Sequence, residues 1–231
     1  MSNTSYPIDY PEATGYWAHE TNYRMSANLP RGFVLHTPEE PADDYPSTPV
    51  YFAAPNRDAS THYFAAYTGR IYQCVPEKYM AIANGVVGKP YPAWANAAVS
   101  LNRQSLSVEI EGYAASIGET LKVGSAQWHG LVALIRHRAQ WYGFPTDRAH
   151  IIGHYEVSNE RSDPGATFPW DALMAELQGE APMTPAERQE MDALKAIVWQ
   201  QAVKNNGQDV ILVDHALRLN KLDVHTAHPP K

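Results

Sequence analysis

The sequence predicts an α/β domain in which a β-sheet is flanked by helices, followed by a C-terminal helical hairpin. Two short runs, Gly32–His36 and Ser105–Gly112, have the apolar character and alternation of strands. Residues Ser125–Tyr142 repeat apolar side chains at the period of a helix, and Gly143 follows them as a stop signal. With 231 residues, 44% of them hydrophobic, the chain is long enough for one domain with an appendage.

Composition and charge exclude several classes of protein. The net charge of −7 and the lack of a basic block argue against a nucleic-acid partner. The single cysteine, Cys74, excludes an intrachain disulfide and a cysteine-rich metal cluster. No apolar run reaches membrane-spanning length, so we expect no membrane insertion. The first residues lack the basic and apolar segments of a secretory signal, so we expect synthesis in a host cytoplasm without a signal peptide.

The first domain is predicted to span residues 1–179, and its other elements are read from turn chemistry and periodicity. We expect a polar N-terminal wrap at 1–31 and a β-hairpin at 61–75. Two long surface loops are expected at 38–60 and 79–104, and a short closing helix at 171–177. Loops of that length in a compact domain are often functional. We therefore expect the two loops to border any site that the domain carries.

A histidine and an aspartate lie at the two ends of one polar loop within Ile151–Trp170. Pro164-Gly165 follows Asp163 directly and is turn chemistry that folds the loop back, so that His154 and Asp163 can converge. Imidazole and carboxylate are both zinc ligands, and a catalytic zinc has three protein ligands. His36 ends a predicted strand, at a sheet edge where sites are commonly built, although a histidine there is often merely structural.

Two glutamates share one face of the strand at Ser105–Gly112. Alternation places Glu109 and Glu111 together, opposite the apolar side chains of the strand. This face is either solvated, with two ordinary glutamates, or it borders a cleft in which one of them serves as a base. His62, on the predicted hairpin, is likewise either a packed histidine or a partner of the site residues.

The second predicted domain, residues 180–231, is a helical hairpin. Thr184 and Glu187 form a capping box at the start of a helix that is expected to end near residue 204, and a second amphipathic stretch covers about 209–222. A hairpin of this size buries little surface by itself. We expect it to pack on the first domain, to pair with another copy as a homo-oligomer, or both.

Together, these sequence motifs resemble those of the zinc-dependent N-acetylmuramoyl-L-alanine amidases of type 2. That superfamily also includes peptidoglycan recognition proteins and phage lysis amidases. The resemblance covers roughly residues 30–177, leaves the hairpin out, and implies a central mixed β-sheet flanked by helices. It is carried by FVLHT, THYFAAYTGRIYQCVPE, SLSVEIEG and IIGHYEVSNERSDPGATFPW, at 33–37, 61–77, 105–112 and 151–170 respectively.

The resemblance implies a role for each candidate residue. The Zn²⁺ ligands would be His36, His154 and Asp163. Glu109 matches the residue that activates the attacking water, and Glu111 is the alternative on the same face. Arg161 stands where many members have a lysine; it could stabilise an oxyanion but could not donate a proton. Another departure is Ile82–Gly85, where many members have a tryptophan-histidine pair before the glycine, so the resemblance carries over no substrate contact at this position.

The implied function is hydrolysis of the amide bond between N-acetylmuramic acid and the L-alanine of the stem peptide. We expect a phage or prophage endolysin that reaches the cell wall after release through a separate pore, with the hairpin in wall binding or oligomerisation. The expected partners are peptidoglycan or muropeptides. Two alternatives stay open: a non-catalytic peptidoglycan recognition module and a cytoplasmic muropeptide-recycling amidase.

Overall fold

The computed structural model describes residues 6–43, 45–179 and 193. The chain divides into two compact units, one of residues 1–140 with 144–179 and one of residues 141–143 with 180–231. Apart from Ala193, the hairpin predicted for 180–231 lies outside the described residues, and its role stays a prediction. Within the described residues, no helix has both the length and the apolar character needed to span a membrane.

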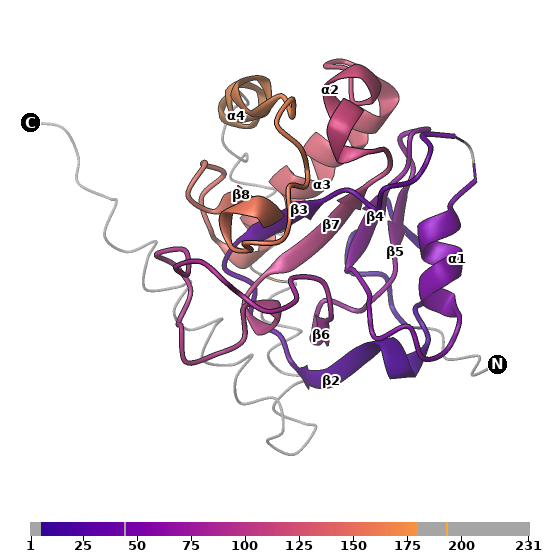
Figure 1. Cartoon of the computed structure of the whole chain (residues 1–231), viewed down its shortest axis with the longest axis vertical. Helices are drawn as coiled ribbons and strands as arrows, with labels where there is room; N and C mark the ends of the chain where they lie inside the picture. The colour runs from indigo at the N-terminus through magenta and orange to yellow at the C-terminus, as the bar shows by residue number, and fades with distance from the viewer. Residues whose placement is uncertain (1–5, 44, 180–192, 194–231) are drawn as a thin grey trace, which may run out of the picture. The chain divides into compact units, whose positions relative to one another are not determined.

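A six-stranded mixed sheet forms the centre of the first unit (Figure 1). Its order is β1-β5-β4-β7-β3-β8, and all neighbours run parallel except β4 and β5. In that order the strands span Thr14–Gly15, Ile71–Gln73, Tyr63–Ala65, Leu106–Ile110, Phe33–His36 and Ile151–Gly153. A separate antiparallel pair joins β2 to β6, at Tyr23–Ala27 and Tyr79–Ala81. The predicted mixed sheet with flanking helices is confirmed.

The helices of the described residues are short except for α3, which lies behind the sheet in the view of Figure 1. The α-helices α1 to α4 span Ser47–Ala53, Ile117–Thr120, Ala126–Tyr142 and Trp170–Gln178. The 3₁₀ helices η1 to η4 span Glu20–Asn22, Leu101–Arg103, Ala114–Ser116 and His154–Glu156. The predicted helices at 125–142 and 171–177 are thus observed with nearly the same bounds.

Strand register divides the sheet into a core face and a second, more polar face. Phe33 pairs with Leu106 and with Ile151, and all three are fully buried. Helix α3 covers this face: the Nε2 atom of Gln127 donates to the carbonyl oxygen of Ala65, 3.0 Å away, at the end of β4. Because side chains alternate along a strand, the residues between these core positions point to the opposite face. The second face is where the candidate site lies.

The prediction of an unbroken loop at 38–60 is wrong, because residues 47–53 form α1. Pro49 is the third residue of α1. The first turn of a helix leaves its backbone N–H groups without intrahelical partners, so a proline there sacrifices no hydrogen bond. The predicted N-terminal wrap also contains regular structure, since β1 and β2 form only by pairing with the distant strands β5 and β6.

A buried ion pair fixes the N-terminal segment onto α3. The Nε atom of Arg138 donates to the Oε1 atom of Glu77 over 2.8 Å, and a second nitrogen of the guanidinium contacts the other carboxylate oxygen. Both residues are almost fully buried. Tyr63 donates to Glu77, and Arg138 also donates to the backbone oxygen of Asp9. The pair therefore connects α3, β4 and the first described residues.

We predict that Arg138→Met lowers the free energy of unfolding by about 3–5 kcal/mol, because it leaves the Glu77 carboxylate buried without its cation. Urea denaturation of the purified chain measures the change. The control is Arg24→Met, which removes the exposed pair with Asp58 and should cost less than about 1 kcal/mol. Equal losses for the two variants would contradict a stabilising role for the buried pair.

Candidate metal centre

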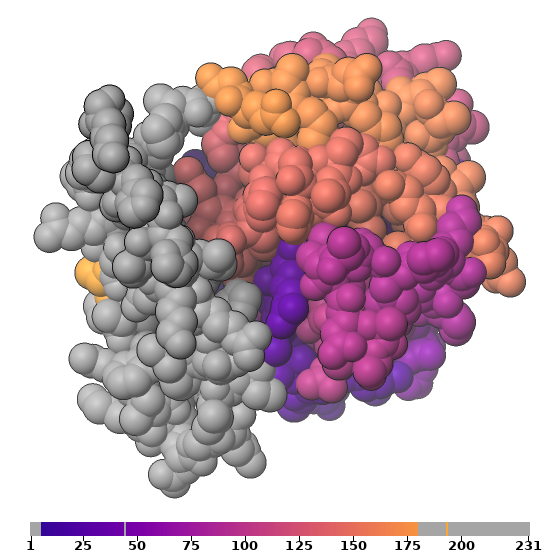
Figure 2. Space-filling model, turned by 90° about the vertical axis from the view of Figure 1, so that its left-hand side faces the viewer, coloured from indigo at the N-terminus to yellow at the C-terminus, as the bar shows by residue number. Residues whose placement is uncertain are grey.

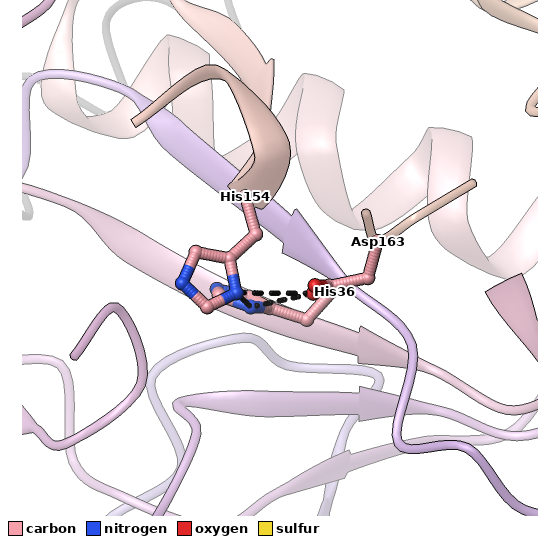
Figure 3. Close-up of side chains that lie close together, drawn as sticks. All are labelled: His36, His154 and Asp163. Atoms are coloured by element: carbon pink, nitrogen blue, oxygen red, sulfur yellow. Dashed lines mark hydrogen bonds and ion pairs between the residues drawn. The ribbon is translucent and has the colours of Figure 1, made fainter. Parts of the chain in front are cut away.

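Three side chains from separate segments converge at the carboxyl-terminal edge of the sheet (Figure 3). His36 ends β3, His154 directly follows the neighbouring parallel strand β8, and Asp163 lies in the loop after η4. The Nδ1 atoms of the two histidines are 3.0 Å apart, and each is 3.1 Å from the Oδ2 atom of Asp163. All three residues are buried. The structure thus brings together the three ligands that the sequence predicts.

The far side of both imidazole rings faces oxygen atoms of Asn84. The Nε2 atom of His36 is 3.1 Å from the Oδ1 atom of Asn84, and the Nε2 atom of His154 is 3.2 Å from its backbone oxygen. Both oxygens only accept, so each Nε2 atom carries a hydrogen and each Nδ1 atom of a neutral ring carries a lone pair. Burial lowers the pKa of His36, which favours that neutral form.

The donor set of this cluster fits a metal ion. Asp163 adds a buried carboxyl group, which is a zinc ligand when ionised. Two lone pairs and one carboxylate oxygen therefore lie within 3.1 Å of one another. Bond lengths to tetrahedral zinc imply separations of about 3.3 Å between ligand atoms. A cation turns this close meeting of three acceptors from repulsive to attractive.

Local packing explains why the loop after β8 holds His154 and Asp163 in place. The Arg148 guanidinium lies 3.7 Å from the ring centre of Trp170 and donates to Glu156 over 2.7 Å. Glu156 in turn accepts from the backbone of Gly153 over 2.6 Å, which fixes the start of η4. The backbone of Tyr155 donates to the carbonyl oxygen of Asp163 over 3.0 Å and closes the loop.

The glycine after Pro164 is required by its surroundings. Gly165 has a φ angle of 108°, and a Cβ atom there would lie 2.0 Å from the backbone oxygen of Ala114. A larger residue would have to displace that backbone, and with it the turn that carries Asp163. On the other side of the loop, residues 85–100 lie against the segment after β8 (Figure 2), where the backbone of Gly88 donates to Val157 over 2.9 Å.

Glu109 lies beside the cluster, on the same face of the sheet. It is paired with His36 across β3 and β7, and the two side chains line one cavity. Its Oε2 atom is buried and has no hydrogen-bond partner within the described residues. Burial, followed by repulsion from Asp163 and Glu40, raises the pKa of Glu109 to about 8, against the opposing effect of Arg161. This carboxyl can therefore hold or release a proton near neutral pH.

Glu111, the alternative base, is placed differently. One oxygen of its carboxylate accepts from the backbone of Asp43 over 2.9 Å, and the other accepts from the backbone of Tyr67 over 2.6 Å. The residue is buried and does not line the cavity. Strand β7 ends at Ile110, so the alternation that grouped the two glutamates does not extend to Glu111. Of the two, Glu109 is the one that faces the cluster.

The cavity in front of the cluster has a volume of 570 Å³. Arg161 lines it, is exposed, and makes no hydrogen bond or ion pair with the described residues. Both predicted loops border it: the first contributes residues from Pro38 to Ser60, including part of α1, and the second contributes Ile82 and Ala83. The segment at 82–85 therefore has two environments. Ile82 and Ala83 line the cavity, whereas Asn84 is buried beneath the histidines.

The sequence left the role of His62 open and did not predict the role of Asn84. His62 does not line the cavity; it contacts Ser107, Asn28 and the backbone of Tyr79, as a packed histidine does. The role of Asn84 carried no signal, because an asparagine before a glycine is ordinary turn chemistry. Only the tertiary structure places it against His36 and His154.

We predict that Glu109→Gln stabilises the metal-free protein, and that the gain grows as the pH rises. The folded-state pKa of Glu109 is raised to about 8, so the stability that its protonated form contributes is lost between about pH 5 and pH 8. At pH 8 the gain in free energy of unfolding should be on the order of 1–3 kcal/mol. Denaturation at several pH values in a chelator measures it, with the exposed Glu119→Gln as control. A gain independent of pH would contradict the raised pKa.

Comparison with known proteins gives one family. A model of the N-acetylmuramoyl-L-alanine amidases matches residues 26–166. No curated protein matches the chain. Solved structures with a similar fold include a selenomethionine derivative of AmpD, at 22% identity and a TM-score of 0.51 over 72% of this chain and 94% of that one. PlyL follows at 19% and 0.52 over 74% and 99%, and the catalytic domain of XlyA at 19% and 0.50 over 71% and 97%.

These identities are low, so the likeness to solved structures shows a shared fold alone. The family match is more informative, because it covers more than half of the chain and includes His36, Glu109, His154 and Asp163. The chain therefore belongs to the N-acetylmuramoyl-L-alanine amidase family.

Proposed function

We propose that this protein is a zinc-dependent peptidoglycan amidase that hydrolyses the bond between N-acetylmuramic acid and the L-alanine of the stem peptide. One observation carries the proposal: two imidazole lone pairs and a carboxylate oxygen meet within 3.1 Å, beside a glutamate whose buried oxygen has no partner within the described residues. Family membership supports the same activity.

Zinc suits the donor set better than a hard cation does. His36 and His154 offer nitrogen, whereas magnesium and calcium take oxygen ligands. With Asp163 they make three protein ligands, the number found in catalytic zinc sites. Zinc bound there supplies a Lewis acid that polarises the scissile carbonyl and makes water acidic near neutral pH.

The other residues of the cavity supply proton transfer and charge. Glu109 accepts a proton from the attacking water and returns it to the departing amine, a task that suits a carboxyl with a pKa raised to about 8. Arg161 carries a positive charge into the cavity and opposes negative charge on the tetrahedral oxygen. Because a guanidinium stays protonated at working pH, Arg161 has no part in proton transfer.

The alternative to an enzyme is a protein that recognises peptidoglycan without cleaving it. Such a protein needs the cavity but neither the complete ligand set nor a base. The geometry favours catalysis, since His36, His154 and Asp163 are assembled and Glu109 faces them. The proposal also concerns where the enzyme meets its substrate, in the cell wall or among released muropeptides. We favour the predicted phage or prophage endolysin, which acts on the cell wall, over a muropeptide-recycling amidase.

We predict that zinc raises the melting temperature of the wild type, since a ligand that binds only the folded state stabilises it. Asp163→Ala removes one of the three ligands and should abolish most of this rise. Differential scanning fluorimetry with and without zinc measures the effect. Asp171→Ala, an exposed aspartate on α4, is the control and should behave like the wild type. An undiminished rise in Asp163→Ala would rule out the proposed ligand set.

We predict that the zinc-loaded wild type releases new N-terminal alanine amines from peptidoglycan. Glu109→Gln should keep its zinc and lose about 10²-fold or more in rate, the usual share of a general base. Amine labelling of the digest and metal analysis of the variant measure both. Binding to the wall without any release by the wild type would overturn the enzyme proposal. Faster release from intact sacculi than from soluble muropeptides supports the endolysin role, and the opposite preference supports recycling.

A further inference from the structure

We propose that Asn84 is a positioning residue that sets the tautomer of both histidines, so that each presents an unprotonated Nδ1 atom to a metal ion. The inference rests on the proposed metal site but not on the proposed reaction. Asn84 is 1% exposed and offers two different oxygens. Its side-chain Oδ1 atom faces the Nε2 atom of His36 at 3.1 Å, and its backbone oxygen faces that of His154 at 3.2 Å.

The orientation of the Asn84 amide is fixed by a chain of hydrogen bonds. Its Nδ2 atom donates to the Oγ atom of Ser105 over 3.0 Å. Ser105 donates its own hydrogen to the backbone oxygen of Leu101 over 2.9 Å, so its Oγ atom has to accept from the amide. A flipped amide would set two acceptor oxygens against each other at Ser105. The oxygen of the amide therefore points to His36.

The backbone of Asn84 is fixed in the same way. Its N–H group donates to the Oδ1 atom of Asn102 over 2.8 Å, and the neighbouring N–H group of Ala83 donates to the same oxygen over 3.3 Å. Asn102 is itself buried. The peptide that carries the second oxygen is thus held while its carbonyl faces His154.

The consequence for the two rings follows from the chemistry of imidazole. A carbonyl oxygen only accepts, so an Nε2 atom facing it has to carry the hydrogen. A neutral ring with hydrogen on Nε2 has its lone pair on Nδ1. Both lone pairs then point at the place between the rings and Asp163. Partners on the outer nitrogen of a metal-binding histidine commonly set the tautomer in this way.

The two oxygens of Asn84 act on different rings, and this separates positioning from packing. Asn84→Leu keeps the volume and the backbone oxygen but removes the acceptor that faces His36. We expect His36 to become a mixture of tautomers while His154 keeps its hydrogen on Nε2. We expect zinc affinity to fall roughly 10- to 100-fold, the usual loss when such a partner is removed. Asn84→Asp keeps an acceptor toward His36, and the Ser105 hydroxyl can turn from Leu101 to donate to its second carboxylate oxygen. This variant should restore the affinity to within about threefold of the wild type.

Long-range proton–nitrogen NMR of the metal-free protein reports the tautomer of each histidine, and competition with a chelating dye measures zinc affinity. The matched control is Asn28→Leu, since Asn28 is also buried and its amide nitrogen lies 3.1 Å from the Nε2 atom of another histidine, His62. That variant should bind zinc like the wild type. Circular dichroism checks that each variant is folded.

Each outcome bears on the inference separately from the proposed reaction. Wild-type protein with hydrogen on the Nδ1 atom of His36 or His154 would overturn it, and this test needs no variant. Folded Asn84→Leu that binds zinc as tightly as the wild type would overturn it too, even if the wild type cleaves peptidoglycan. A wild type that has the expected tautomers and binds zinc but cleaves nothing would sink the amidase proposal and leave the role of Asn84 standing.

Discussion

Parallel pairing of β3 with both β7 and β8 is the constraint on which the rest of the site depends. Because the three strands run the same way, their carboxyl ends meet at one edge of the sheet. His36 is in register with Glu109, and His154 follows β8 directly. A slip of one residue between β3 and β7 would send the side chains of His36 and Glu109 to opposite faces. The core face of the same strands, buried under α3, makes such a slip costly, since it would also expose Phe33 and Leu35.

The position of Asp163, the third candidate ligand, depends on side-chain contacts instead of strand pairing. Asp163 lies in a loop, and the loop is held by the stack of Arg148 on Trp170 and by the contact of Arg148 with Glu156. The contact between Arg148 and Trp170 explains the structural role of the tryptophan in the FPW sequence that ends the loop. Its tryptophan offers a flat face for a guanidinium, which then reaches back to the turn that starts with His154. Rigid support of this kind lets a loop residue hold a ligand position as well as a strand residue does.

Much of this arrangement was predictable from the sequence, because it depends on local patterns. A short apolar run identified β3, period-two alternation identified β7, the helical period identified α3, and turn chemistry identified the loop around Asp163. The family resemblance then grouped His36, His154 and Asp163, and the structure places them together. The resemblance also preferred Glu109 over Glu111, and the structure agrees in placing Glu109 alone of the two in the cavity.

The features that escaped prediction are those decided by distant contacts. Strand β1 has two residues and exists only because β5 lies beside it. Helix α1 was predicted as part of a loop, although its proline lies in the first turn, where it sacrifices no hydrogen bond. Asn84 looked like a turn residue, and nothing local shows that its amide is buried against His36. When a polar group bonds to a residue far away in the sequence, composition and periodicity do not predict that contact.

The two hydrogen bonds to Glu111 have a mechanical consequence. Its carboxylate holds the backbone of Asp43, at the end of the segment that begins with the cavity residues Pro38 and Glu39. Glu111 is also two residues along the chain from Glu109. One wall of the cavity is therefore tied by a hydrogen bond to the chain segment that directly follows the strand bearing Glu109. This wall therefore has a preformed shape, and we expect any adjustment to the size of a bound molecule to come from the other walls.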